Sequence, residues 1–172
     1  MPAKPTILVV DDERDLVDLY AAWVSGDYDV RTAYGGREAL EELEDGQVDI
    51  VLLDRRMPDL SGDEVLARMR EDGHDAWVVM VTAVDPGLDI VDMDIDDYLV
   101  KPVSRQDLVD RIESLRSEAG EDEERRELVS LTRKRATLQQ SLSPTDLQTS
   151  EEYERLEEEI EELDADLEDS PF

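Results

Sequence analysis

The sequence predicts an α/β fold: a five-stranded parallel, doubly wound sheet followed by a C-terminal α-helical hairpin. Five short apolar runs alternate with helical patterns over the first 117 residues, and this alternation is typical of a parallel sheet. One run, Ile50-Val51-Leu52-Leu53, is apolar throughout, as expected for a strand buried on both faces. Beyond residue 124 strand patterns end, and leucines recur at helical spacing.

The predicted strands are short apolar runs, and the helices between them repeat apolar residues three or four positions apart. We expect strands at residues 7–10, 28–32, 48–53, 77–81 and 98–100. We expect helices at residues 14–25, 37–43, 62–70, about 88–93 and 104–115. Gly26 is expected to end the first helix, and Ser104 to cap the last. The fourth helix should be abbreviated or loose, because the segment that holds it is short and acidic.

The change of pattern predicts three segments: an α/β domain at 1–117, a polar linker at 118–124 and a helical hairpin at 125–172. The two hairpin helices carry coiled-coil-like seams of large apolar residues: Leu128, Leu131, Leu138 and Leu142, then Tyr153, Leu156, Ile160, Leu163 and Leu167. Each helix is expected to be about 15–20 residues long, and an isolated helix of that length is only marginally stable in water. The seams must therefore pack on each other, on the α/β domain or on a second copy.

The charge is strongly acidic, with 48 Asp and Glu against 18 Lys and Arg and a net charge of −30. The acid is spread over the chain, since residues 121–172 hold only 18 of the acidic residues. At about 1 M salt the Debye length falls to roughly 3 Å, so the self-repulsion of such a surface fades. We interpret the composition as adaptation to a salt-rich cytoplasm. It also argues against direct nucleic-acid binding, which needs a basic surface.

The sequence also argues against a disulfide-bonded, a secreted and a membrane-spanning protein. The chain has no cysteine, so disulfides and thiolate metal sites are absent. The N-terminus lacks the basic region and cleavage site of a signal peptide, and no apolar run approaches the roughly 20 residues of a membrane helix. We therefore expect a cytoplasmic protein that does not insert into a membrane.

Distinctive polar residues stand at the ends of four predicted strands: Asp11-Asp12, Asp54, Thr82 and Lys101. In a parallel sheet these ends share one edge, where functional groups gather. Three converging carboxylates repel one another without a cation, and Mg²⁺ prefers such oxygen ligands. Lys101 and the Thr82 hydroxyl can then hold phosphoryl oxygens, and Asp54 can act as the nucleophile. Taken singly, each residue also fits a structural role: a helix cap, a strand-end hydroxyl or a surface charge.

The stretches "VVDDERD", "LLDRRMPDLSG", "VTA" and "DDYLVKP" together resemble the receiver domain of two-component response regulators, over about residues 5–117. The resemblance implies a flavodoxin-like sheet, with Asp54 as the phosphoacceptor. It assigns Mg²⁺ to Asp11, Asp12, Asp54 and the backbone carbonyl of Arg56. It makes Thr82 and Tyr98 the switch residues and Lys101, joined to Pro102 by a cis bond, the phosphate-binding lysine. The C-terminal stretch "LTRKRATLQQSLSPTDLQTSEEYERLEEEIEEL" resembles the HalX domain that follows haloarchaeal receivers.

The resemblance implies that a histidine kinase is the partner and that its phosphoryl group moves to Asp54 with Mg²⁺. The chain would then be no enzyme beyond self-phosphorylation and autodephosphorylation at Asp54. Its hairpin would control a downstream protein or a homodimer. Arg56 and Val84, two residues beyond Asp54 and Thr82, cannot act as a base for water, so we expect slow autodephosphorylation.

Two alternatives remain open. A Mg²⁺-dependent aspartyl-phosphate phosphohydrolase would usually carry a second acid two residues beyond the nucleophile, where this chain has Arg56. A phosphorylation-independent scaffold would not need the pocket residues. Elsewhere, Gly62 is expected to supply backbone freedom in a turn, His74 to be a solvated loop residue, and Arg55 has no assigned role.

Overall fold

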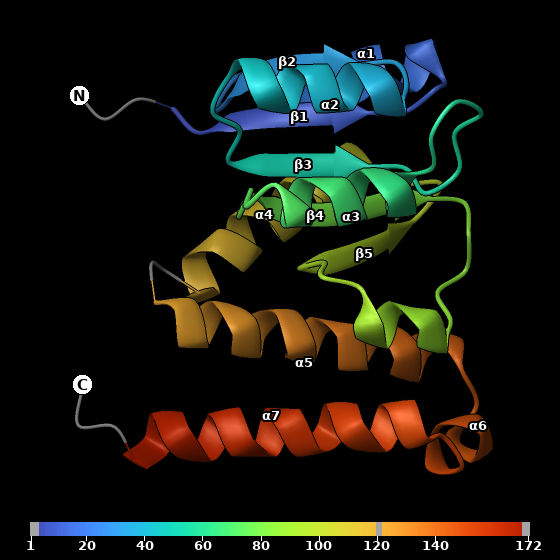
Figure 1. Ribbon diagram of the computed structural model, residues 1–172, viewed down its shortest axis with the longest axis vertical. Coiled ribbons are helices and arrows are strands. Elements are labelled where there is room, and N and C mark those ends of the chain that lie inside the picture. Colours follow the sequence, from blue (N-terminus) through green and yellow to red (C-terminus); the bar gives the residue numbers. More distant parts are fainter. Residues whose placement is uncertain (1–3, 120–121, 170–172) are drawn as a thin grey trace. The chain divides into compact units, whose positions relative to one another are not determined.

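The computed structural model describes residues 4–119 and 122–169 (Figure 1). Its parallel sheet has the strand order β2-β1-β3-β4-β5. The strands are β1 (Thr6–Val10), β2 (Asp29–Ala33), β3 (Ile50–Leu53), β4 (Trp77–Thr82) and β5 (Asp97–Val100). The predicted fold class is thereby confirmed, although β3 begins two residues later than the apolar pattern suggested.

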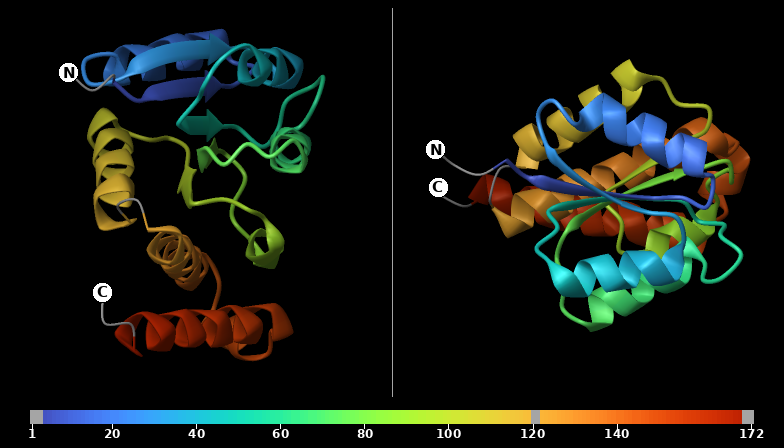
Figure 2. Two further views of the ribbon diagram at one scale, coloured as in Figure 1. Left: turned by 60° about the vertical axis from the view of Figure 1, so that its left-hand side comes forward. Right: turned by 90° about the horizontal axis from the view of Figure 1, so that it is seen from above.

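Helices connect the strands and then form the C-terminal part. They are α1 (Arg14–Val24), α2 (Gly36–Asp45), α3 (Gly62–Glu71), the 3₁₀ helix η1 (Leu88–Asp92), α4 (Arg105–Ala119), α5 (Glu123–Ser141), α6 (Pro144–Gln148) and α7 (Glu151–Asp169). Helix α1 lies on one face of the sheet, and α2 and α3 lie on the other (Figure 2). The expected abbreviation of the fourth helix is confirmed, because a single 3₁₀ segment of five residues stands there.

The described residues divide into two compact units. The first comprises residues 4–84 and 99–109, and the second comprises 85–98, 110–119 and 122–169. The division passes through β5 and α4, so it does not follow the boundaries at 117 and 125 that the sequence suggested. Those boundaries stay predictions.

The core of the first unit is built around β3. All four residues of this strand are at most 2% exposed, because β1 and β4 flank it and both faces are covered. Val65 and Met69 of α3 are fully buried as well. Burial on both faces explains why the run is continuously apolar and does not alternate.

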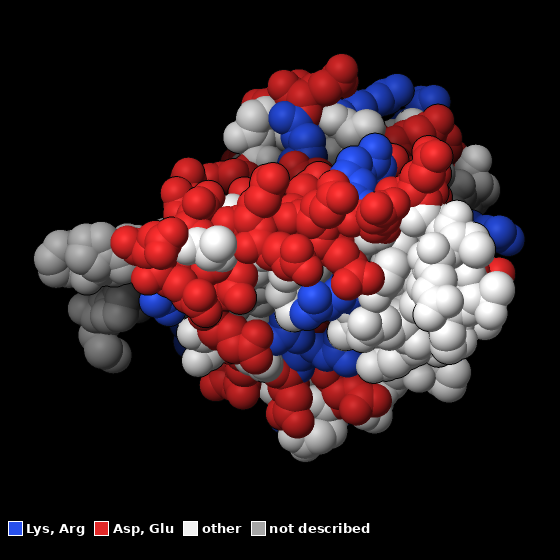
Figure 3. Space-filling model, turned by 90° about the horizontal axis from the view of Figure 1, so that it is seen from below, with Lys and Arg blue, Asp and Glu red and all other residues white. Residues whose placement is uncertain are grey.

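The second unit contains the hairpin. Helices α5 and α7 pack along each other, and both contact η1 (Figure 1). Leu131 and Leu138 of α5 and Leu156 and Ile160 of α7 are buried, so the seams pack on each other within the chain. The exposed positions of α7 are mostly acidic, and acidic side chains spread over the face of the molecule in Figure 3.

The connections are more helical than predicted. Helix α4 continues to Ala119 and α5 begins at Glu123, so residues 118–119 and 123–124 of the predicted linker are helical; residues 120–121 lie outside the described residues. The carboxylate of Asp122 caps α5 by accepting the backbone N–H groups of Glu124 and Arg125. Within the described residues, no helix is both long and apolar enough to cross a membrane.

Candidate functional site

The strand order reverses direction between β1 and β3, and the candidate site lies where these two strands end. Val10 and Leu53 are register partners, and Asp11 and Asp54 follow them directly. The backbone N–H of Asp54 donates to the carbonyl of Val10 across 3.1 Å, which holds the two strand ends together. A crevice at such a switch point is the usual ligand site of an open parallel sheet.

Three carboxylates gather here as the sequence predicted. One oxygen each of Asp11, Asp12 and Asp54 lies within 4.8 Å of the others. Asp11 is 2% exposed and Asp54 is 6% exposed, whereas Asp12 is open to solvent. Two buried carboxylates beside a third are unfavourable unless positive charge or hydrogen-bond donors meet them.

Lys101, which directly follows β5, supplies that positive charge. Its Nζ lies 2.6 Å from Oδ2 of Asp11 and 3.4 Å from Oδ2 of Asp54. Burial acts against the lysine charge, but the hydrogen bond and charge of Asp11, with the charge of Asp54, raise the pKa of Lys101 above its ordinary value. The lysine therefore stays protonated and bridges the two buried acids.

The acidic cluster fits a hard divalent cation. Backbone N–H groups of Glu13 and Arg56 approach Oδ1 of Asp11 and of Asp54 at 2.9 and 3.5 Å, which orients both carboxylates. Three carboxylates against one lysine leave an excess of negative charge. Mg²⁺ binds this kind of donor set, using one or two carboxylates together with water and phosphate oxygens.

Thr82 and Tyr98 differ in where they lie. Thr82 is fully buried at the end of β4, and its carbonyl accepts the backbone N–H of Lys101 across 2.8 Å. Its hydroxyl accepts the backbone N–H of Val84 across 3.3 Å. Tyr98 is buried in β5 within the second unit. The first unit therefore brings together five of the predicted residues: Asp11, Asp12, Asp54, Thr82 and Lys101.

The loop after Asp54 holds two features that sequence reasoning missed. The guanidinium of Arg55 makes two hydrogen bonds of 2.9 Å to the carboxylate of Asp63, which anchors the loop to α3. Gly62 is needed for close approach and not for a left-handed conformation, since a Cβ there would lie 2.0 Å from the carbonyl oxygen of Asp54. The peptide bond between Lys101 and Pro102 is cis, as the resemblance implied.

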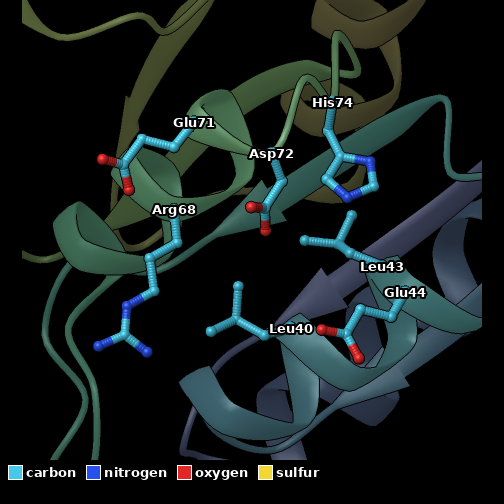
Figure 4. A pocket seen from close by; sticks show the side chains of 7 residues that line it. All are labelled: Leu40, Leu43, Glu44, Arg68, Glu71, Asp72 and His74. Carbon is cyan, nitrogen blue, oxygen red and sulfur yellow. The ribbon is translucent and has the colours of Figure 1, made fainter.

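A cavity of about 320 Å³ lies between α2 and α3 (Figure 4). Its lining consists of Leu40, Leu43, Glu44, Arg68, Glu71, Asp72 and His74. None of these residues belongs to the acidic cluster. His74 lies in the loop before β4, as the sequence suggested, and is half-buried in this wall.

Comparison with known proteins gives two family matches. A model of the response regulator receiver domain matches residues 7–113, and a model of the HalX domain matches residues 119–170. A candidate transcriptional regulator of Haloferax volcanii is 48% identical over 137 residues, which is 79% of this chain but 23% of that protein. The alkaline phosphatase synthesis transcriptional regulatory protein PhoP of Bacillus subtilis is 40% identical over 114 residues, which is 63% of this chain and 47% of that protein. The chain thus spans less than half of either relative.

Solved structures are similar over the receiver part. A receiver domain protein of Methanospirillum hungatei is 26% identical with a TM-score of 0.61, over 65% of this chain and 93% of that one. The response regulator TrrA of Thermotoga maritima, solved in complex with Mg²⁺ and beryllofluoride, is 32% identical with a TM-score of 0.57, over 64% of this chain and 97% of that one.

Proposed function

Because the chain belongs to the response regulator receiver family, with a HalX domain after the receiver, we propose that it is the phosphoryl-accepting component of a two-component phosphorelay. A histidine kinase is the phosphoryl donor. Asp54 is the acceptor, and the resulting change of conformation is passed to a downstream protein or a second copy through the C-terminal helices.

The observation that carries the proposal is the bridge of Lys101 between Asp11 and Asp54 inside the acidic cluster. An oxygen of the Asp54 carboxylate attacks the phosphorus of the kinase phosphohistidine. The new P–O bond forms as the P–N bond breaks, and the imidazole leaves with the bonding pair. The ammonium of Lys101 is already placed beside Asp54, so it can hold an oxygen of the transferred group.

The other pocket residues have supporting roles in this proposal. Asp11, Asp12, Asp54 and the Arg56 carbonyl are the cation ligands. When bound there, Mg²⁺ supplies positive charge that offsets the carboxylates and the phosphoryl oxygens. The Thr82 hydroxyl, now accepting from Val84, turns to donate to a phosphoryl oxygen. Tyr98 changes its rotamer as the ends of β4 and β5 adjust.

The chain performs no turnover on a separate substrate in this proposal. It catalyses only formation and hydrolysis of its own acyl phosphate. Arg56 is exposed and Val84 is half-buried, and neither side chain can activate water for hydrolysis. The phosphorylated state is therefore long-lived.

Phosphorylation by acetyl phosphate tests the proposal. The protein in concentrated potassium chloride with Mg²⁺ is incubated with acetyl phosphate, and its intact mass is measured. Wild type should gain one phosphoryl group, Asp54→Asn should gain none, and Asp75→Asn, which alters an exposed loop carboxylate, should behave as wild type. Labelling that persists in Asp54→Asn, or never occurs in wild type, contradicts the proposal. Sustained hydrolysis of p-nitrophenyl phosphate by wild type but not by Asp54→Asn would favour the phosphohydrolase alternative.

A further inference from the structure

Helix α5 is fastened within the second unit to the segment that ends in β5. The hydroxyl of Ser130 donates to Oδ1 of Asp96 across 2.5 Å, and both residues are buried. On the next turn of the helix toward its N-terminus, the guanidinium of Arg126 lies 3.5 Å from Oδ2 of the same carboxylate. Asp96 is thus held by α5 although 30 or more residues separate them in the chain.

Asp97 is held even more firmly. It is 1% exposed and lies between two guanidinium groups: Arg111 of α4, at 3.0 Å, and Arg133 of α5, at 3.1 Å. Burial raises the pKa of the Asp97 carboxyl, and the two arginines act in the opposite direction. Arg133 also reaches Ser114 and Glu118, so one side chain of α5 ties β5 to α4. The side chain of Arg133 is 15% exposed and that of Arg111 is 38% exposed, so the ion pair of Asp97 with Arg133 is the one that salt screens less.

Lys134 completes the contact. Its ammonium donates to the backbone carbonyl of Val91, at 3.2 Å, and to that of Met93, where η1 ends. Only three of the 18 basic residues are lysines, and a compact ammonium with rotatable donors suits two converging carbonyls better than a planar guanidinium. Lys134 is 7% exposed, and burial lowers its pKa.

The fastened segment has a particular place in the chain. Residues 85–98 begin three residues after Thr82 and end three residues before Lys101. Thr82 and Lys101 are two residues that the proposed function brings to a phosphoryl group. A shift of either residue is passed to one end of the segment through the covalent chain. The covalent chain therefore provides a route from the phosphorylation site to the contacts that hold this segment.

We propose that Ser130, Arg133 and Lys134, the α5 clamp, hold residues 85–98 in the conformation of the unphosphorylated protein, and that phosphorylation of Asp54 releases α5 from this segment. The inference rests on the proposed function. In the structure Lys101 bonds both Asp11 and Asp54 and the α5 clamp is closed, so the two sets of contacts occur in the same conformation. The closed clamp carries costs, since Nε of Arg133 is buried without an acceptor among the described residues and Lys134 is desolvated.

Hydrogen exchange on the full chain in concentrated potassium chloride tests the release directly. Beryllofluoride with Mg²⁺ serves as the phosphoryl mimic. In wild type we expect faster exchange in α5 and in residues 85–98, together with slower exchange around Asp54. Slower exchange around Asp54 with unchanged or increased protection of α5 overturns the clamp and leaves the proposed function standing. No change anywhere overturns both, because the mimic then does not bind.

The thermodynamic linkage between the clamp and beryllofluoride binding gives a second test of the proposal. If the clamp favours the unphosphorylated conformation, Arg133→Gln and Lys134→Met should each tighten beryllofluoride binding, by about fivefold or more in calorimetry. Arg125→Gln is the matched control, since it removes the charge of an exposed arginine of α5 that makes no contact of the clamp. It should bind as wild type does. Equal affinities in all four proteins overturn the clamp. Circular dichroism checks that the variants remain helical, and the wild-type exchange result decides the matter if they do not.

Discussion

The ammonium of Lys101 lies 2.6 Å from the carboxylate of Asp11, a residue that follows β1 and is almost completely buried. Without the lysine, Asp11 and Asp54 would be left as two buried charges. Replacement by Met should lower the free energy of unfolding by about 1–3 kcal/mol in the absence of divalent cations. Saturating Mg²⁺ should reduce the loss, because the cation replaces the missing charge. Chemical denaturation with and without Mg²⁺ measures both effects. A loss that Mg²⁺ leaves unchanged would show that the cation does not use these carboxylates.

Gly62 limits how closely α3 can approach Asp54. A Cβ at this position would lie 2.0 Å from the Asp54 carbonyl oxygen, a backbone atom that cannot turn aside. Gly62→Ala should therefore destabilise the protein by about 1–3 kcal/mol and slow phosphorylation of Asp54. Gly26→Ala is the matched control, because nothing lies within 4 Å of its Cβ, and it should be neutral within experimental error. Thermal unfolding and the acetyl phosphate reaction report the two effects. Equal behaviour of the two variants would contradict the close approach.

Much of the fold and site could be predicted because the signals are local or simply spaced. The apolar run at β3 and the polar residues after each strand require only the geometry of a parallel sheet. The missed features depend on side chains far apart in sequence. Nothing in the pattern around Asp97 indicates that Arg133, 36 residues later, meets its carboxylate. Similarly, Ser61-Gly62 resembles an ordinary helix start, and only the three-dimensional path of the loop shows that Gly62 touches the Asp54 backbone.

The seam between α5 and α7 should be essential to the hairpin. Leu156 is 1% exposed and Ile160 is 6% exposed, so changing both to Asp places two charges in an apolar seam. We expect loss of most hairpin helicity in circular dichroism, with Asp54 still phosphorylated by acetyl phosphate. A control with Glu158 and Glu162 changed to Gln alters only exposed positions of α7 and should stay helical. If phosphorylation is lost together with helicity, the two units instead form one cooperative structure.

Burial of Lys134 predicts a dependence on alkaline pH. Its pKa in the folded protein is lowered by burial, although Asp94, Asp96, Glu159 and Asp92 act to raise it. The unfolded chain, with a lysine pKa near 10.4, therefore binds this proton more strongly than the folded one. The free energy of unfolding should therefore rise with pH between the lowered pKa of the folded protein and the pKa of the unfolded chain. This gain is complete above the unfolded-chain pKa and is lost as pH falls through the folded-protein pKa.

Chemical denaturation of wild type and Lys134→Met at a series of alkaline pH values, up to the pKa of lysine in the unfolded chain, measures the effect. The unfolding free energy of wild type should rise relative to that of the variant as pH increases. Lys4→Met removes an exposed lysine and should follow the wild-type profile. A constant difference between wild type and Lys134→Met would mean that Lys134 is not desolvated in solution.

Val84 should influence how long the acyl phosphate survives. Its backbone N–H donates to the Thr82 hydroxyl, so the residue lies directly beside a proposed switch group. Its apolar side chain cannot orient or deprotonate water, whereas a carboxylate at this position can. Val84→Glu should therefore shorten the half-life of the phosphorylated protein, measured by intact mass after removal of acetyl phosphate. Leu19→Glu, which adds the same charge at an exposed position of α1, should not change it. A wild-type half-life of only seconds, or equal decay in wild type and Val84→Glu, would contradict the role assigned to this position.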